Sequence, residues 1–184
     1  MEGKSSVTLR EYSRNRRKLT LIHLKKINSN NVWDIVDLKV AEDQESFVAS
    51  NSDSIIEAYT TIGTGCSAFP FGVYDDEEPV GFLMIGHNMA ALDGVCEEDA
   101  PDVVKHNYLF WRLMVDENFQ GKGYGKAAIK LALDFIKTWP CSEEEYCVIT
   151  YEPENKAAKN LYASFGFAET GEIVDDEVVA VLKL

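Results

Sequence analysis

The sequence predicts a single α+β domain, in which a central β-sheet carries helices on both faces. Segments with strand-like and helix-like periodicity follow one another in the order β-α-α-β-β-β-α-β-α-β-β. The 184 residues, of which 46% are hydrophobic and 27% charged, suit one globular domain. We therefore expect one domain over residues 18–184. Residues 1–17 have little apolar periodicity and are expected to form an extension that can be disordered.

The distribution of charge limits which classes of molecule the protein can bind. The formal net charge is −13, and residues 1–30 carry about +6 against about −19 for the remainder. An acidic domain repels nucleic-acid phosphates and attracts cations, so we expect no nucleic-acid partner. The basic run Arg14–Lys18 has two interpretations, a nucleic-acid contact or targeting signal and a solvated leader, and we favour the second.

Other features favour a cytoplasmic location. No apolar run approaches the ~20 residues that span a bilayer, so no membrane partner is expected. The N-terminus lacks the apolar stretch of a secretory signal. The four cysteines show no paired spacing typical of metal ligands and are interpreted as reduced thiols, with no metal expected: Cys66, Cys96, Cys141 and Cys147.

The first elements are an edge strand and a helix. Lys18–Lys26 alternates apolar and polar residues, which predicts a strand. Asn30 or Asn31 can cap a helix over Val32–Val40, with Trp33 on its inward face.

A second helix and a hairpin follow. Asp53 is expected to cap a short helix over Ser54–Thr61. Ala68–Tyr74 and Val80–Asn88 are predicted strands, joined by the charged turn Asp75–Pro79. The polar segment Ala90–His106 has no periodicity and is expected to be a long loop, a kind of segment that is often functional.

The stretch from Tyr108 to Thr138 is the most informative. Tyr108–Val115 is short, apolar and rich in aromatic and branched residues, which favours a buried strand. An amphipathic helix ends the stretch, and a turn with glycines at 121, 123 and 125 lies between them. A strand, a glycine turn and a helix together present free backbone N–H groups to an anion.

Three phosphate-binding patterns compete for this turn. A Walker loop fails twice, because Gln120 replaces its first glycine and Ala127 replaces its hydroxyl residue. The dinucleotide pattern Gly-x-Gly-x-x-Gly fails once, because Lys126 replaces its last glycine. The pattern Gln/Arg-x-x-Gly-x-Gly/Ala is satisfied completely by Gln120–Gly125.

The C-terminal part is predicted to contain a strand, a helix and two further strands. Glu145–Tyr151 is a predicted strand, and a helix is expected from Pro153 through Phe165, before a glycine. Two closing strands are expected at Phe167–Ile173 and Val178–Leu184.

Two motifs in these elements resemble one family. Gln120–Gly125 is similar to the pyrophosphate loop of the GCN5-related N-acetyltransferase (GNAT) superfamily, and Asn155–Phe167 resembles its Asn-x-x-Ala-x-x-Leu-Tyr-x-x-x-Gly-Phe element. The resemblance covers about Leu19 to the C-terminus. It implies the GNAT fold, whose mixed, mostly antiparallel sheet is splayed between its fourth and fifth strands. It also implies acetyl-CoA as co-substrate, direct transfer through a ternary complex, and a homodimer.

The resemblance also implies roles for individual residues. The strand before the loop pairs with the pantetheine arm in the family, and Tyr162 matches the tyrosine that protonates the departing thiolate. Asn155 matches a cofactor-contacting asparagine, although a plain helix cap is an equal interpretation. The implied cofactor-binding residues are Leu113, Met114, Val115, Gln120, Gly121, Lys122, Gly123, Tyr124, Gly125, Lys126, Asn155 and Tyr162.

The general base is less clear from the sequence. Relatives that act on polyamines place a glutamate where this chain has Trp111, which puts an inherited base in doubt. Glu152, at the end of the fifth strand, is the best local candidate. Glu42 and Glu45 are candidates for binding the positive end of a substrate, together with Trp111. For each acidic residue, a solvated surface charge is an equal interpretation.

The resemblance suggests a substrate class. Three segments look like the bacterial spermine/spermidine (diamine) acetyltransferases: Phe47–Asn51, Trp111–Asp116 and Tyr151–Asn155. An acidic protein also suits a polycationic acceptor. The hypothesis is N-acetylation of a polyamine or a small diamine. The alternatives are acetylation of another amine, such as a protein N-terminus, an aminoglycoside or an amino acid, and a non-catalytic acyl-CoA-binding module.

Overall fold

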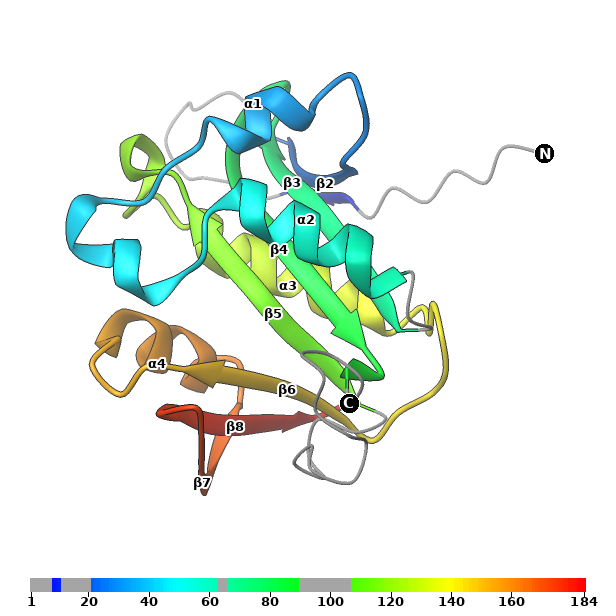
Figure 1. The fold of residues 1–184 in the computed structure, drawn as a ribbon, viewed down its shortest axis with the longest axis vertical. Helices are drawn as coiled ribbons and strands as arrows, with labels where there is room; N and C mark the ends of the chain where they lie inside the picture. Colours follow the sequence, from blue (N-terminus) through cyan, green and yellow to red (C-terminus); the bar gives the residue numbers. More distant parts are fainter. Residues whose placement is uncertain (1–7, 11–20, 63–65, 90–106) are drawn as a thin grey trace.

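The computed structural model describes residues 8–10, 21–62, 66–89 and 107–184. These residues form one eight-stranded sheet in the order β1-β2-β3-β4-β5-β6-β8-β7, with helices on both faces (Figure 1). The elements are β1 (Thr8–Arg10), β2 (Leu21–Lys26), α1 (Val32–Val36), η1 (Glu42–Phe47), α2 (Asn51–Ile62), β3 (Ser67–Asp75), β4 (Glu78–His87), β5 (Tyr108–Val115), η4 (Glu117–Phe119), α3 (Tyr124–Ile136), β6 (Tyr146–Tyr151), α4 (Lys156–Ala163), β7 (Ala168–Val174) and β8 (Glu177–Lys183).

The predicted α+β architecture is confirmed, and β5 has the predicted bounds. Within the expected N-terminal extension, β1 pairs with β2, while residues 1–7 and 11–20 lie outside the described residues. The loop predicted over Ala90–His106 also lies outside them.

Two predictions about the first helices are wrong. Trp33 is 74% exposed, and Ile35 takes the inward position on α1. Asp53 lies inside α2, which begins at Asn51, and it is the Ser50 hydroxyl that accepts a hydrogen bond from the Asp53 amide. In each helix, tertiary packing rather than local spacing decides which residue faces inward and where the helix begins.

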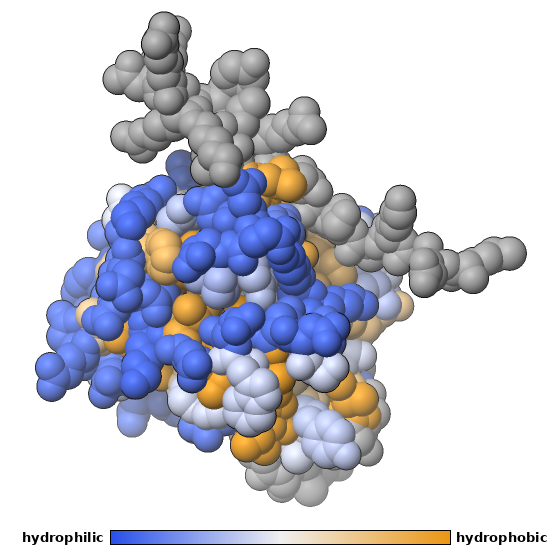
Figure 2. All heavy atoms as spheres, turned by 90° about the horizontal axis from the view of Figure 1, so that it is seen from above, coloured by the Kyte–Doolittle hydropathy of each residue, from blue (hydrophilic) through white to orange (hydrophobic). Residues whose placement is uncertain are grey.

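The two faces of the sheet have separate cores. On one face, α3 and α4 pack on the strands through a cluster that includes Ile129, Leu131 and Tyr162. On the other face, Ile35 of α1 and Ala58 of α2 pack against a second cluster. Seen from above, the surface is largely hydrophilic, with smaller hydrophobic areas between the polar side chains (Figure 2).

The sheet opens between β5 and β6. These strands pair in parallel only over Tyr108–Phe110 and Cys147–Ile149, although both continue beyond this segment. Figure 1 shows them diverging from there. The expected splay is therefore confirmed, and it leaves backbone groups of the second half of β5 without a partner strand on that side.

A β-bulge lies where the opening begins. Met84 pairs with Arg112 and Ile85 pairs with Phe110, so Trp111 is the extra residue on β5. Trp111 packs against the cluster beneath α2, and Arg112 forms an ion pair with Glu57 of α2 at 3.1 Å. The bulge thus turns two consecutive side chains toward the same helix.

Candidate active site

Two adjoining cavities lie at the opening between β5 and β6. The larger, of about 540 Å³, extends from the opening to the glycine turn and the start of α3. The smaller, of about 200 Å³, lies on the η1 and β8 side of the opening. They share six lining residues: Phe47, Val48, Leu113, Asn155, Ala158 and Tyr162.

The glycine turn exposes backbone to the larger cavity. Gly121 and Gly123 have φ angles of 73° and 91°, a region that favours glycine. A Cβ at either position would project into open space. Gly123 is the N-cap of α3 and offers no side-chain cap, and the first α-helical backbone bond runs from the Ala127 amide to the Gly123 carbonyl. The amides that precede Ala127 are therefore available to an anion.

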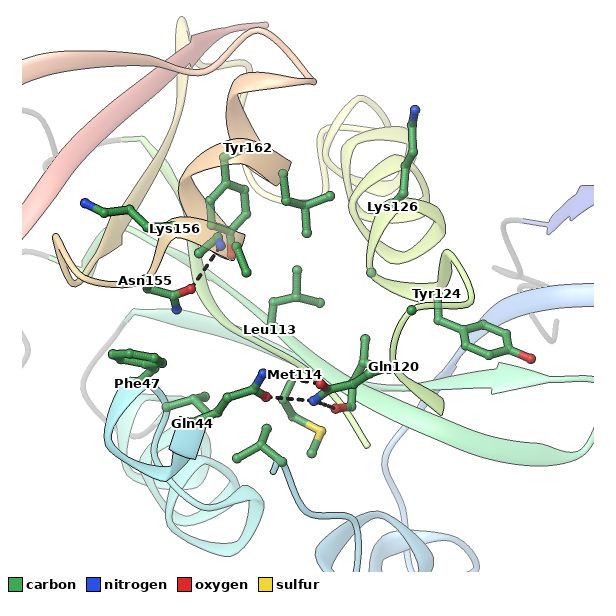
Figure 3. A pocket seen from close by; sticks show the side chains of 18 of the residues that line it. Gln44, Phe47, Leu113, Met114, Gln120, Tyr124, Lys126, Asn155, Lys156 and Tyr162 are labelled. Atoms are coloured by element: carbon green, nitrogen blue, oxygen red, sulfur yellow. Dashed lines mark hydrogen bonds between the residues drawn. The ribbon is translucent and has the colours of Figure 1, made fainter. Parts of the chain in front are cut away.

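A pair of glutamine side chains fixes the entry to this turn. The Gln120 amide nitrogen donates to the Gln44 Oε1 at 2.7 Å and to the Val115 carbonyl at 3.0 Å. The Gln44 amide nitrogen donates to the Gln120 Oε1 at 3.2 Å (Figure 3). Gln120 therefore ties the turn both to β5 and to η1.

The first helical side chain of α3 is anchored outside the cavity. The Tyr124 hydroxyl donates to Asp75 at the end of β3, at 2.5 Å. Figure 3 shows its ring directed away from the cavity, so its backbone rather than its phenol faces a ligand. Burial, together with the bond to the Asp75 carboxylate and its charge, raises the pKa of Tyr124 to about 12.

Eleven of the twelve predicted cofactor-binding residues line the larger cavity, and Lys122 does not. The Lys122 ammonium group donates to the Asn118 carbonyl at 2.7 Å and lies 5.1 Å from the centre of the Phe119 ring. The structure therefore directs this cation toward η4 and away from the cavity. Leu113, Met114 and Val115 do line it, beside the open edge of β5.

Asn155 and Tyr162 lie where the two cavities meet. The Asn155 side-chain oxygen accepts a bond from the Ala158 amide at 2.9 Å, so Asn155 caps α4 and lines both cavities at once. Tyr162 is 6% exposed, and its ring stacks on Tyr151 with 6.0 Å between the centroids.

The surroundings of Tyr162 keep its phenol protonated. Burial raises its pKa above the usual value, and the groups of Cys147, Glu177 and Tyr151 add to this effect. Among the described residues its hydroxyl has no hydrogen-bond partner. It is therefore available to a ligand as a proton donor.

The smaller cavity has a lining of polar and aromatic residues. Its lining includes Phe47, Trp111, Tyr151 and Tyr162. The guanidinium group of Arg112 also lines it, 5.4 Å from the centre of the Trp111 ring, and its charge is offset by Glu57. The aromatic rings in this lining can bind an ammonium group.

The acidic residues predicted from the sequence lie outside both cavities. Glu42 and Glu45 are exposed on η1, although their neighbours Asp43 and Phe47 line the larger cavity. Glu152 is half-buried one residue beyond β6 and lines neither cavity. Sequence reasoning missed Gln44, which meets Gln120 from 76 residues away, and no periodicity or motif marked it.

The larger cavity fits coenzyme A. Open amides at the start of α3 suit a pyrophosphate, and the unpaired edge of β5 suits an extended amide-bearing arm. Within the described residues, no group of three or more His, Cys, Asp or Glu is placed to hold a metal ion. Nor does any helix there have the length and apolar character needed to cross a membrane.

Comparisons with known proteins agree with this geometry. Residues 32–167 match the acetyltransferase (GNAT) family. The chain is 29% identical to the spermine/spermidine N(1)-acetyltransferase of Bacillus subtilis strain 168 over 168 residues, which cover 89% of this chain and 99% of the relative. A probable spermine N(1)-acetyltransferase of Bacillus subtilis subsp. natto is equally similar.

Solved structures share the fold at low sequence identity. A spermidine N-acetyltransferase from Vibrio cholerae, solved with CoA and spermine, has a TM-score of 0.62 at 18% identity, covering 89% of this chain and 94% of that one. An aminoglycoside acetyltransferase solved with coenzyme A has a TM-score of 0.68 at 16% identity, covering 88% and 94%. The chain therefore belongs to the GNAT family and is an acetyl-CoA-dependent N-acetyltransferase.

Proposed function

We propose that this enzyme N-acetylates a polyamine or a small diamine, such as spermidine or spermine, by direct transfer in a ternary complex. The proposal places this activity in a single domain over residues 18–184. The observation that carries it is the meeting of two cavities at Tyr162, Asn155 and Leu113, because donor and acceptor can then bind side by side. None of the described cysteines, Cys66, Cys141 and Cys147, lines either cavity, which favours direct transfer over a cysteine-bound intermediate.

Each part of the larger cavity has a separate task in this proposal. Acetyl-CoA supplies the acetyl group as an activated thioester. The turn at Gly121–Lys126 binds the pyrophosphate through its amides, and Leu113–Val115 orient the pantetheine arm through the open edge of β5. Lys122 contributes charge near η4 and not a contact inside the cavity.

Tyr162 is the proposed proton donor. Acetyl transfer forms a C–N bond and breaks a C–S bond, so the amine loses a proton and the leaving thiolate gains one. A phenol is a weak acid, but burial also raises the pKa of a thiol, as it does for Cys147. The buried surroundings of Tyr162 likewise disfavour a free thiolate, which favours its protonation as it leaves.

Three observations support a polyamine acceptor. Aromatic residues such as Phe47 and Trp111 belong to the lining of the smaller cavity, and aromatic rings attract ammonium groups. The net charge of −13 attracts polycations. The two Bacillus subtilis relatives, named for spermine or spermidine acetylation, are similar over nearly their whole length.

The remaining roles are secondary proposals. Glu152 is the candidate general base and acts through water, because its side chain lies outside the cavity linings. Glu42 and Glu45 attract the positive end of the acceptor from the exposed face of η1.

A cytoplasmic homodimer is also proposed from the family resemblance, and light scattering during size-exclusion chromatography tests the dimer.

Substrate profiling tests the proposed acceptor. Release of coenzyme A is measured with spermidine, spermine, short diamines, amino acids, aminoglycosides and peptides at matched concentrations. We expect the highest kcat/KM for a polyamine or diamine. A higher kcat/KM for an aminoglycoside or a peptide would reject the proposed acceptor and leave the acetyltransferase activity standing.

A further inference from the structure

A carboxylate at the start of β8 reaches the acceptor side of the opening. β8 runs antiparallel to β6, and Val178 pairs with Tyr151 at the end of β6. Glu177, the residue before Val178, therefore lies at the end of β6 that has parted from β5. The hairpin between β7 and β8 places it there, outside both GNAT motifs in the sequence.

Glu177 lines the smaller cavity and not the larger one. Tyr162, in contrast, lines both. Glu177 thus lies on the acceptor side of the opening, close enough to Tyr162 for its charge to help raise the pKa of that phenol. It is also the only acidic residue among the described residues that line the smaller cavity.

The Glu177 carboxylate is available to a ligand. Within the described part of the chain, its side chain has no hydrogen-bond or ion-pair partner. Arg112, the cation in the same lining, is neutralised by Glu57 on α2. The lining of the smaller cavity thus holds one acidic residue, Glu177, and one basic residue, Arg112, which has Glu57 as its ion-pair partner.

The chemistry of the reaction indicates which nitrogen this charge binds. The reacting amine must be neutral to attack, and a carboxylate beside it would favour its charged form. A second ammonium group on the same acceptor has no such requirement and gains from a carboxylate partner. This second group also has to be bound on the acceptor side, away from the thioester.

We propose that Glu177 binds the second, non-reacting ammonium group of the acceptor and so selects diamines over monoamines. This inference rests on the proposed function, and it assigns a specificity role to a residue outside both motifs. The methylene chain between the two nitrogens lies along the smaller cavity, while Tyr162 lies at the reacting end.

A matched pair of amines tests the inference. Butane-1,4-diamine and butan-1-amine have the same carbon chain and differ in one terminal amino group. For Glu177→Gln, we expect kcat/KM for the diamine to fall about 10-fold to 100-fold, mostly through KM, because a charge-assisted hydrogen bond is lost. The loss for the monoamine should be much smaller, and the KM for acetyl-CoA should not change.

Control variants separate this role from folding and from general electrostatics. Asp175→Asn removes the same charge from the same hairpin at an exposed position with a φ of 50°, which asparagine tolerates, and should leave both amines unaffected. Glu177→Asp, which keeps the charge, should recover part of the diamine preference even if Glu177→Gln folds poorly.

Each outcome decides a different claim. If Glu177→Gln lowers kcat/KM equally for the two amines, or for neither, Glu177 does not have the proposed role. Diamine turnover by the wild-type enzyme would still uphold the proposed function in that case. Absence of diamine turnover in the wild-type enzyme would overturn both.

Discussion

The side-chain amides of Gln44 and Gln120 hydrogen bond to each other in both directions, at 2.7 and 3.2 Å, across 76 residues of sequence. Gln120 also bonds to the Val115 carbonyl on β5. This pair holds η1, the glycine turn and the open strand in one arrangement, and all three border the larger cavity.

Loss of the glutamine pair should weaken coenzyme binding. Gln120→Ala removes two hydrogen bonds with Gln44 and one to Val115, and we expect the KM for acetyl-CoA to rise about 5-fold to 150-fold, at up to ~1 kcal/mol for each bond. Gln44→Ala should have a smaller effect. In a double-mutant cycle the two changes should be coupled by about 0.5–1.5 kcal/mol. Strictly additive effects would show that the pair does not organise the site.

The backbone of Gly123 should be needed for coenzyme binding, beyond its effect on stability. Gly123→Ala forces a side chain into a φ of 91°, at a cost of about 1–2 kcal/mol. Gly171→Ala is the matched control, with a φ of 88° and equally open surroundings, but on β7. Urea unfolding should show similar destabilisation, whereas only Gly123→Ala should raise the KM for acetyl-CoA. An equal rise in both variants would contradict the assignment of the turn.

Removal of the Tyr162 hydroxyl should affect the chemical step. For Tyr162→Phe we expect kcat to fall about 100-fold with little change in acetyl-CoA affinity, because proton donation is lost and the ring packing remains. Tyr151→Phe is the control, since the Tyr151 hydroxyl is bonded to Glu169 at 2.8 Å, and it should have a small effect. Unchanged turnover in Tyr162→Phe would remove the proposed donor. A non-catalytic acyl-CoA-binding module would be supported only if the wild-type protein also showed no turnover.

Stability should fall in alkali because several phenols have raised pKa values. Burial raises the pKa of Tyr151 to about 12, helped by its bond to Glu169, and that of Tyr124 to about 12. Below the ordinary tyrosine pKa of about 10, these phenols are protonated in both states and their stabilising effect is complete. Between pH 10 and 12 the unfolded chain loses protons that the folded chain keeps, so the unfolding free energy decreases. Urea unfolding at pH 8, 9.5 and 11 measures this decrease, and Tyr151→Phe should make it smaller. A flat profile would contradict the raised values.

The sequence could predict those features that depend on local spacing. The apolar run Tyr108–Val115 is β5 itself, and Asn155 caps α4 as its position suggests. The predicted glycine turn after Gln120 forms and lines the larger cavity, because glycine readily adopts the positive φ angles that the turn requires. In each case the residues that make the feature are neighbours in sequence.

Features that depend on distant contacts could not be predicted. The position of Glu152 at the end of a strand beside the opening predicts a catalytic role, but the direction of its side chain is set by packing, and Glu152 lies outside both cavities. Glu177 lies in the acceptor cavity only because β8 pairs with β6 in a particular register. Gln44 reaches the turn because Asp116 accepts a bond from the Lys39 amide and holds the chain before η1 against β5.

The central claim is that donor and acceptor bind together in adjoining cavities that meet at Tyr162. Initial rates over a matrix of acetyl-CoA and spermidine concentrations test it most directly. The account predicts double-reciprocal lines that intersect, as a ternary complex requires. Parallel lines, which indicate an acetylated enzyme intermediate, would contradict it.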